Sequence, residues 1–249
     1  MIIVVGAGPA GLAAAKSAAG KGCQVTVIDS QPRGGGQYWR HLTEVSGYKS
    51  NRSAAYLEEL QQNKLITHIT GAQVWSAEKL GDGYQLNYLQ AGVEKKISAQ
   101  KIILTTGAYD RTLPFPGWTT SGVMTPGGAQ SLLKGHGVVA GKAIVVSGTG
   151  PFLLPVATAL AKSGAHVEII EAQSPLRWAL SPLALLLNPG KFPELIHYAS
   201  AIVRLKIKVS FGSAVTEYHS GVAQVSKVRS NLSIRKKNVR NINADVVAT

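Results

Sequence analysis

Short apolar runs that lead into glycines organise the hydrophobic pattern of this chain. Residues 2–5 form one such run, and residues 143–146 form another in the second half. Each is followed by a stretch rich in alanine or leucine and then by a second apolar run, at 24–28 or at 166–170. Apolar strands that alternate with helical stretches are typical of parallel sheets with crossover helices. The pattern therefore predicts an α/β chain built from two similar units in tandem.

The glycines after the first run have the spacing of a nucleotide-binding turn. Gly6 permits a tight turn from strand to helix, Gly8 lets a diphosphate approach the backbone, and Gly11 lets the helix pack on the strand. Asp29 ends the next run, where its carboxylate can accept both hydroxyl groups of an adenosine ribose. We therefore predict a Rossmann-like dinucleotide-binding domain. Its expected cofactor contacts are Gly6, Gly8, Pro9, Ala10, Gly11, Asp29 and Ser30.

The second unit keeps part of the same motif. Gly148 and Gly150 follow its first strand and Glu171 closes the next, so these are the expected contacts of a second nucleotide site. Leu153 stands where the third glycine would be, which predicts a helix pushed off the strand and an altered seat for the diphosphate. Two alternatives stay open: this unit binds NAD or another adenine nucleotide, or it is a vestigial fold kept for packing.

A glycine-rich loop and a strand exit extend the first site. Residues 34–36 are three glycines that expose backbone amides, and the loop follows the strand that ends at Asp29, so we expect it to contact the ligand. The apolar strand at 101–104 breaks at Gly107, where the chain can pass close to a bound cofactor. Two prolines and a glycine then form a stiff exit as far as Gly117.

The remaining segments predict a small β-meander in each domain. The expected strands lie at 67–76, 84–89 and 93–97 in the first domain and at 208–218, 222–228 and 231–236 in the second. Further helices are expected at 53–63, 129–134 and 194–205, with an irregular proline-rich stretch at 176–193. We predict a first domain at 1–117, a second at 118–245, and the start of a return to the first domain at 246–249.

The charge of the chain is strongly positive. There are 26 Lys and Arg residues against 13 Asp and Glu residues, a formal net charge of +13. Such an excess can attract nucleic acid, an acidic protein or an anionic membrane surface. Because no aromatic stacking pattern or nucleic-acid motif accompanies it, we predict no nucleic-acid partner. The densest cluster, at 227–240, is interpreted as a solvated face or a face toward an acidic partner subunit.

Cysteine and histidine usage excludes several kinds of chemistry. The single cysteine, Cys23, excludes a disulfide framework, a cysteine-ligated iron–sulfur cluster and an internal redox dithiol. The six histidines are scattered without the spacing of a metal or catalytic site, so no metal and no catalytic side chain is predicted. The first strand begins at Ile2, and the longest apolar stretch, 179–187, is too short to cross a bilayer. We expect a cytoplasmic protein without a membrane span.

Taken together, these motifs resemble a known family. The first glycine motif, the exit at 105–107 with 114–117, and the second glycine motif are similar to the FAD- and NAD(P)-dependent pyridine nucleotide-disulfide oxidoreductases, which include glutathione and thioredoxin reductases. The stretches 107–118, 122–130 and 150–157 more narrowly resemble one component of heteromeric amine-oxidising flavoenzymes. These components include the A-type polypeptide of opine oxidase, the B-type polypeptide of hydrogen cyanide synthase and the alpha polypeptide of dye-linked proline dehydrogenase.

The resemblance implies FAD at the first site. It adds Gly35, Gly36, Gln37, Val74, Thr106 and Gly107 to the expected cofactor contacts. It also implies a partner flavoprotein subunit that oxidises a small amine or amino acid, while this chain carries electrons. Members of the narrower group generally continue with a last flavin-contacting segment, and often with a cysteine cluster, so the sequence looks truncated at its C-terminus. It is expected to be either a fragment or a shortened protein with an incomplete flavin site.

Three functional hypotheses follow from these observations. The favoured one is an FAD-dependent oxidoreductase that serves as one subunit of an amine or amino-acid (opine-like) dehydrogenase or oxidase. Its flavin would supply the redox chemistry, because no side chain qualifies as a general acid, base or nucleophile. The alternatives are a stand-alone NAD(P)H-dependent flavoprotein reductase and a non-catalytic nucleotide-binding subunit.

Overall fold

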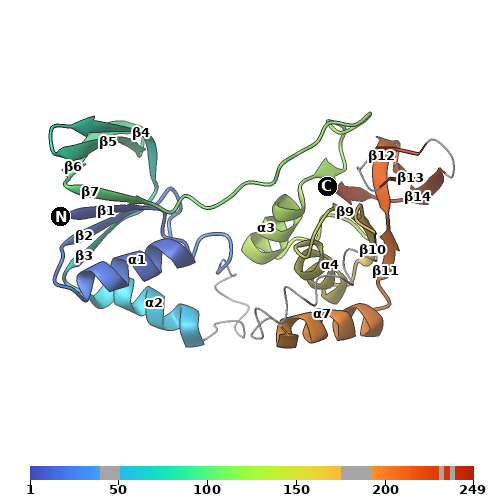
Figure 1. Cartoon of the computed structure of the whole chain (residues 1–249), viewed down its shortest axis with the longest axis horizontal. Helices are drawn as coiled ribbons and strands as arrows, with labels where there is room; N and C mark the ends of the chain where they lie inside the picture. The colour runs from blue at the N-terminus through green and yellow to red at the C-terminus, as the bar shows by residue number, and fades with distance from the viewer. Residues whose placement is uncertain (40–50, 175–191, 230–232, 236–238) are drawn as a thin grey trace. The chain divides into compact units, whose positions relative to one another are not determined.

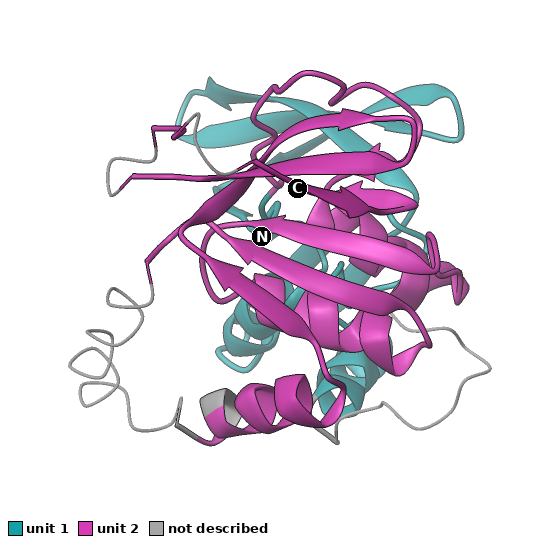
Figure 2. Ribbon diagram, turned by 90° about the vertical axis from the view of Figure 1, so that its right-hand side faces the viewer, with its two compact units in different colours: residues 1–108 teal, residues 109–249 magenta. Residues whose placement is uncertain are grey.

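The chain divides into two compact units, residues 1–108 and 109–249 (Figure 2). The computed structural model describes residues 1–39, 51–174, 192–229, 233–235 and 239–249. Gly117, near which we expected the domain boundary, lies within the second unit. Each unit contains one parallel sheet and one antiparallel meander of three strands, as the α/β prediction of two Rossmann-like folds requires.

Unit 1 is a parallel sheet covered on both faces (Figure 1). Its sheet strands and helices are β1 (Ile2–Val5), α1 (Pro9–Ala19), β2 (Val25–Ile28), α2 (Asn51–Gln62), β3 (Ile66–Ile69) and β7 (Lys101–Leu104). The strand order is β3-β2-β1-β7, with every pair parallel. One face packs against α1 and α2 through Leu12, Ala15 and Leu60, and the other packs against the meander through Leu86 and neighbouring residues.

The meander of unit 1 consists of β4 (Ala72–Leu80), β5 (Gly83–Gln90) and β6 (Val93–Ala99). The expected strand at 67–76 is in fact two strands, β3 and β4. They are separated at Gly71, whose φ of 60° is a left-handed conformation that suits glycine. Turns at 81–82 and at 91–92 join β4 to β5 and β5 to β6.

Unit 2 repeats this plan with one more strand. Its sheet strands and helices are β8 (Val123–Met124), α3 (Pro126–His136), β9 (Ala143–Gly148), α4 (Leu153–Lys162), β10 (His166–Glu171), α7 (Phe192–Arg204), β11 (Lys208–Phe211) and β15 (Val246–Ala248). The meander consists of β12 (Ser213–His219), β13 (Val222–Lys227) and β14 (Arg240–Asn243). Helices α3, α4 and α7 pack on one face of the sheet and the meander packs on the other (Figure 1).

Several sequence expectations take a different form in unit 2. The expected strand at 208–218 is divided into β11 and β12 at Gly212, which has a φ of 59°. Of the expected strand at 231–236, residues 233–235 are described, and Ile234 forms an isolated bridge with Val228. The irregular stretch expected at 176–193 lies almost entirely outside the described residues.

The two units share their order of strands. Sheet 1 runs β3-β2-β1-β7 and sheet 2 runs β11-β10-β9-β15-β8, so β15 occupies beside β9 the place that β7 occupies beside β1. Residues 246–248, at which we expected a return to the first domain, pair in parallel with β9 and with β8. In each unit the meander is inserted before this last strand of the shared plan.

Tyr218 connects the start of unit 2 to the end of its meander. The hydroxyl group of this buried side chain donates to the carbonyl oxygens of Ala244 and Asp245, at 3.1 and 3.2 Å. Its backbone carbonyl lies against Gly117, where a side chain would overlap it and where φ is +88°. Burial, and next the charge of Asp245, raise the pKa of Tyr218 above its usual value.

No helix among the described residues is both long enough and apolar enough to span a bilayer.

The turn that leads into β15 predicts a pH-dependent stability. The Asp245 carboxylate accepts hydrogen bonds from the amides of Ala143 and Lys142, at 2.9 and 2.8 Å, and these bonds lower the pKa of Asp245. A depressed folded-state pKa contributes stability above the unfolded value of about 3.9, which is lost as pH falls through the folded pKa. We expect Asp245→Asn to lower the urea midpoint at neutral pH but not at about pH 2.

The matched control is Asp82→Asn, at an exposed acid in the turn between β4 and β5. Its urea midpoint should follow that of the unmodified protein at every pH. A deficit of Asp245→Asn that stayed constant down to the lowest pH would contradict the assignment to the ionised carboxylate.

Candidate nucleotide-binding site

The turn between β1 and α1 is built so that two of its glycines are required by the fold. Gly6 has a φ of +101°, and a side chain there would overlap the carbonyl of Thr105. A side chain at Gly11 would overlap the carbonyl of Gly6 and the hydroxyl of Thr105. The helix therefore starts in direct contact with the strand ends, as the spacing of these glycines predicted.

Gly8 differs from its two neighbours in the motif. Its φ of −72° and ψ of 179° are open to any residue, and no atom lies within 4 Å of the place where a Cβ would be. The fold therefore does not require glycine at position 8. A side chain would instead fill the open space in front of the turn, which is the space that a ligand lying against the backbone would use.

The backbone amides around Gly8 are available as donors. The first hydrogen bond within α1 runs from Leu12 N to Gly8 O, at 2.9 Å, and no side chain caps the helix. Among the described residues, the amides of Gly8, Ala10 and Gly11 have no partner, and Pro9 has no N–H to satisfy. Three free donors at the positive end of a helix dipole form a site for an anion such as a diphosphate.

Asp29 lies directly behind this turn. The side chain is 7% exposed, and its two oxygens accept hydrogen bonds from the amide of Ala7 and, at 2.6 Å, from the amide of Gln31. Each carboxylate oxygen has a second lone pair, so both can still accept from the hydroxyl groups of a ribose. The acid is therefore fixed by the glycine turn on one side and by the following loop on the other.

The loop after Asp29 folds over the turn. The amide of Gly35 donates to the carbonyl of Ala7 at 2.7 Å. Gly36 has a φ of 57° and lies so close to Gly8 that a Cβ would be 3.0 Å from the Gly8 Cα. Ser30 and Gln37 are exposed at either end of this stretch. The structure thus brings together the glycine motif, Asp29 and the glycine-rich loop.

Thr105 is a residue of this site that the sequence reasoning did not select. Its hydroxyl lies 2.8 Å from the carbonyl oxygen of Val5 and 2.9 Å from that of Gly6, to which it donates. The sequence did contain a signal for it, because Thr105 is the first residue of the strand exit at 105–107, of which only Thr106 and Gly107 were expected to contact the cofactor. Those two residues follow it and are exposed, and Gly107 has a φ of 80°.

Val74 takes a different position from the other expected contacts. It is half-buried and packs against the core that includes Val5 and Ile28, the residues that directly precede Gly6 and Asp29. Its strand is joined to the acid through the backbone, because the amide of Ala72 donates to the carbonyl of Asp29 at 2.9 Å. The described geometry therefore places Val74 behind the turn and connects it to the site through Asp29.

His68 on β3 lies near the acid. Its Nε2 atom is buried and has no hydrogen-bond partner among the described residues. Burial lowers the pKa of His68, while the charge of Asp29 acts in the opposite direction. The imidazole is therefore neutral at pH 7, and it is not an additional cation in this site.

The second turn offers fewer donors than the first. Glu171 is 1% exposed, and its carboxylate accepts from the amides of Gly150, at 3.0 Å, and Gln173, at 2.8 Å. Helix α4 begins only at Leu153, whose amide donates to the carbonyl of Gly150 at 3.3 Å. The amides that correspond to those of Gly8 and Gly11 are thus already bonded. Leu153 itself is buried, with Cδ2 against Gly148.

Comparisons with known proteins give the family of the chain. The family model of the pyridine nucleotide-disulphide oxidoreductases matches residues 1–247. The A-type polypeptide of opine oxidase from Rhizobium meliloti is 33% identical over 240 residues, which are 90% of this chain and 44% of that protein. The HcnB polypeptide of hydrogen cyanide synthase from Pseudomonas protegens is 31% identical over 86% of this chain and 47% of its own length.

A solved structure shows the same fold. Thioredoxin reductase of T. acidophilum superimposes with a TM-score of 0.69 at 20% identity, over 99% of this chain and 75% of the other. The chain spans less than half the length of the two curated relatives above. From its matched length and its two dinucleotide-type units, the chain belongs to the pyridine nucleotide-disulphide oxidoreductase family.

Proposed function

We propose that the turn at Gly8 binds the diphosphate of FAD. The observation that carries this proposal is the open space at Gly8 together with the three unpartnered amides of Gly8, Ala10 and Gly11 at the start of α1. Asp29 supplies the acceptor that an adenosine ribose requires, and the glycine loop at 34–36 closes one side of the seat. The residues present therefore fit a dinucleotide, and the family of the chain favours a flavin dinucleotide.

We further propose that the chain is the electron-carrying subunit of a heteromeric amine or amino-acid oxidoreductase. The relatives that support this are named as subunits of opine oxidase, hydrogen cyanide synthase and sarcosine oxidase. A bound flavin would accept the electrons. The protein would hold the diphosphate at Gly8, orient the ribose at Asp29, and leave oxidation of the substrate to a partner flavoprotein subunit.

A stand-alone reductase fed by NAD(P)H is the second candidate. Glu171 favours it, because an acid at the end of the second strand is the usual acceptor for an unphosphorylated ribose. The bonded amides of Gly150 and Leu153 oppose it, because a diphosphate there would have to displace existing hydrogen bonds. We therefore favour electron entry from a partner subunit over entry from a nucleotide at the second turn.

Absorbance spectroscopy separates these functions. The purified protein is incubated with FAD, and unbound FAD is then removed. We expect the protein to keep the flavin absorption bands. NADH should leave these bands unchanged, whereas an opine together with a competent partner subunit should bleach them. Bleaching by NADH alone would establish the reductase instead, and a colourless protein that takes up no added FAD would refute both.

Gly8→Val tests the seat of the diphosphate. Because the backbone at position 8 accepts any residue and the site of the Cβ is open, the variant should fold with its melting temperature nearly unchanged. The branched side chain should nevertheless lower FAD affinity by at least about a hundredfold by blocking the amides. Ala13→Val is the matched control, because it also introduces a valine side chain, at an exposed position of α1. Full flavin retention by Gly8→Val would contradict the proposed seat.

Thr105→Val tests whether the hydroxyl positions the turn. The substitution keeps the shape of the side chain but leaves the carbonyls of Val5 and Gly6 without this donor. We expect a loss of about 1 kcal/mol in the free energy of unfolding and a measurable rise in the dissociation constant of FAD. Thr105→Ser should restore both. Rescue of stability without rescue of affinity would limit Thr105 to a structural role.

A further inference from the structure

A short ribbon at the end of the second meander concentrates positive charge. Lys227 ends β13, and residues 233–235 pair with residues 227–229. Arg229 N donates to Ser233 O at 2.9 Å, and Arg235 N donates to Lys227 O at 2.8 Å. In this antiparallel register Lys227 stands directly opposite Arg235, with both side chains on one side of the ribbon. Arg229, two positions after Lys227, projects from the same side.

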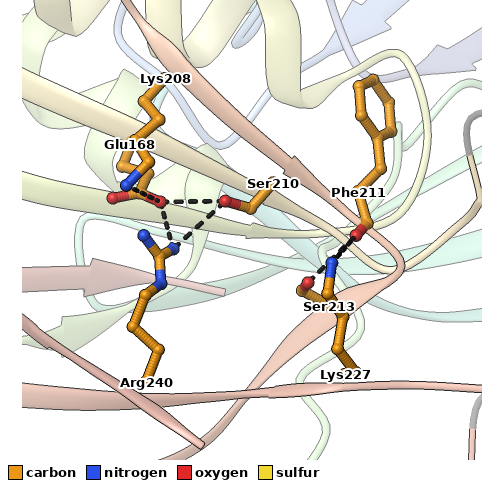
Figure 3. Close-up of polar contacts among 7 residues, drawn as sticks. All are labelled: Glu168, Lys208, Ser210, Phe211, Ser213, Lys227 and Arg240. Atoms are coloured by element: carbon orange, nitrogen blue, oxygen red, sulfur yellow. Dashed lines mark hydrogen bonds and ion pairs between the residues drawn. The ribbon is translucent and has the colours of Figure 1, made fainter. Parts of the chain in front are cut away.

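Two further cations extend this surface onto the neighbouring strands (Figure 3). Arg240 pairs opposite Val225 and therefore shares the side of Lys227. Its guanidinium group donates to the carboxylate of Glu168 and, at 3.2 Å, to the hydroxyl of Ser210. Lys208 lies 3.8 Å from the same carboxylate. We name these five residues the basic face: Lys208, Lys227, Arg229, Arg235 and Arg240.

The charges of the basic face are only partly compensated. Glu168 is already engaged by Arg240, by Lys208 and by the hydroxyl of Ser210, so it is not available to the ribbon. Lys227 donates to a neutral group, the carbonyl of Phe211, at 2.9 Å. Like charges directly opposite each other on neighbouring strands destabilise a ribbon. Packing does not require Lys227 and Arg235 to be cations, because both are exposed, and this indicates a binding surface.

The opposite side of the ribbon points to a protein as the occupant. Ile234, next to Arg235 in the paired segment, is 55% exposed on the side opposite Arg235. Val239, just before β14, is 52% exposed. A ribbon that exposes both cations and apolar side chains fits a protein groove that has an acidic wall and an apolar wall. A phosphate backbone or a layer of lipid headgroups offers no apolar wall to cover Ile234 and Val239, which disfavours nucleic acid and an anionic lipid surface.

We infer that the basic face docks on an acidic surface of the partner flavoprotein subunit. The identity of the partner rests on the function proposed above, whereas the location and sign of the surface rest on the geometry of unit 2. The acidic surface would supply carboxylates to Lys227, Arg229 and Arg235, which form no ion pair within the described part of the chain, and the groove would cover Ile234 and Val239. Charge pairing of this kind speeds association and makes the affinity depend on salt.

The test measures, by calorimetry, association with the polypeptide that complements the A-type polypeptide of Rhizobium meliloti opine oxidase. We expect the affinity to fall by at least about tenfold between about 50 mM and about 500 mM salt. The double variant Lys227→Glu/Arg235→Glu should lose at least about tenfold at low salt. Lys79→Glu/Lys96→Glu, which reverses two exposed lysines on the meander of unit 1, is the matched control and should bind as the unmodified protein does.

Three outcomes would overturn the inference. They are no association of the unmodified protein, an affinity that does not depend on salt, and an equal loss in the control variant. The unmodified protein could instead bind a DNA duplex or phosphatidylserine vesicles. If Lys227→Glu/Arg235→Glu abolished that binding but left association with the partner unchanged, and the control variant changed neither, the basic face would be a site for nucleic acid or lipid. The flavin bands of both variants report separately on the proposed function, so a failure at the face and a failure at the flavin seat are distinguishable.

Discussion

The direct contact between the start of α1 and the ends of two strands is the constraint on which the first site depends. The Cα of Gly11 lies against the carbonyl of Gly6, and the hydroxyl of Thr105 bonds that same carbonyl from the neighbouring strand. Because the helix is held there, its first amides lie at the open turn around Gly8, and no side chain caps them. The donors are therefore oriented before any ligand arrives, and no binding energy is spent on ordering them.

The internal repeat separates what the fold needs from what a ligand needs. Both units keep the same order of strands, yet the amides of Gly8 and Gly11 are free at the first turn whereas their counterparts at Gly150 and Leu153 are bonded at the second. The difference between the two turns follows from the extra methylene group of the second acid and from the side chain at the third glycine position. Asp29 reaches the amide of Ala7, whereas the longer Glu171 reaches the amide of Gly150, and Leu153 occupies the place of Gly11. The same topology thus supports a binding turn in one unit and a largely satisfied turn in the other.

Sequence reasoning succeeded where the relevant residues are close in the chain. The glycine motif, the acid at the end of the second strand and the alternating strands are local patterns, and the two-unit α/β architecture follows from them. The division at Gly71 was missed because a single glycine within a strand-like run fits a bulge as well as a break between two strands. Thr105 was missed for a different reason. Its role depends on a carbonyl that lies 100 positions earlier in the chain, and only the pairing of β7 with β1 brings the two together.

The positive charge shows the same contrast between composition and structure. A net charge of +13 spread over 249 residues costs little, because charges farther apart than about 8–10 Å are largely screened at physiological salt. Only cations that the fold places side by side repel strongly, and the register of the ribbon does this to Lys227 and Arg235. Composition alone could not locate that pair, because the pairing depends on a backbone register. The electrostatic cost is therefore local, and so is the surface at which an anionic partner would relieve it.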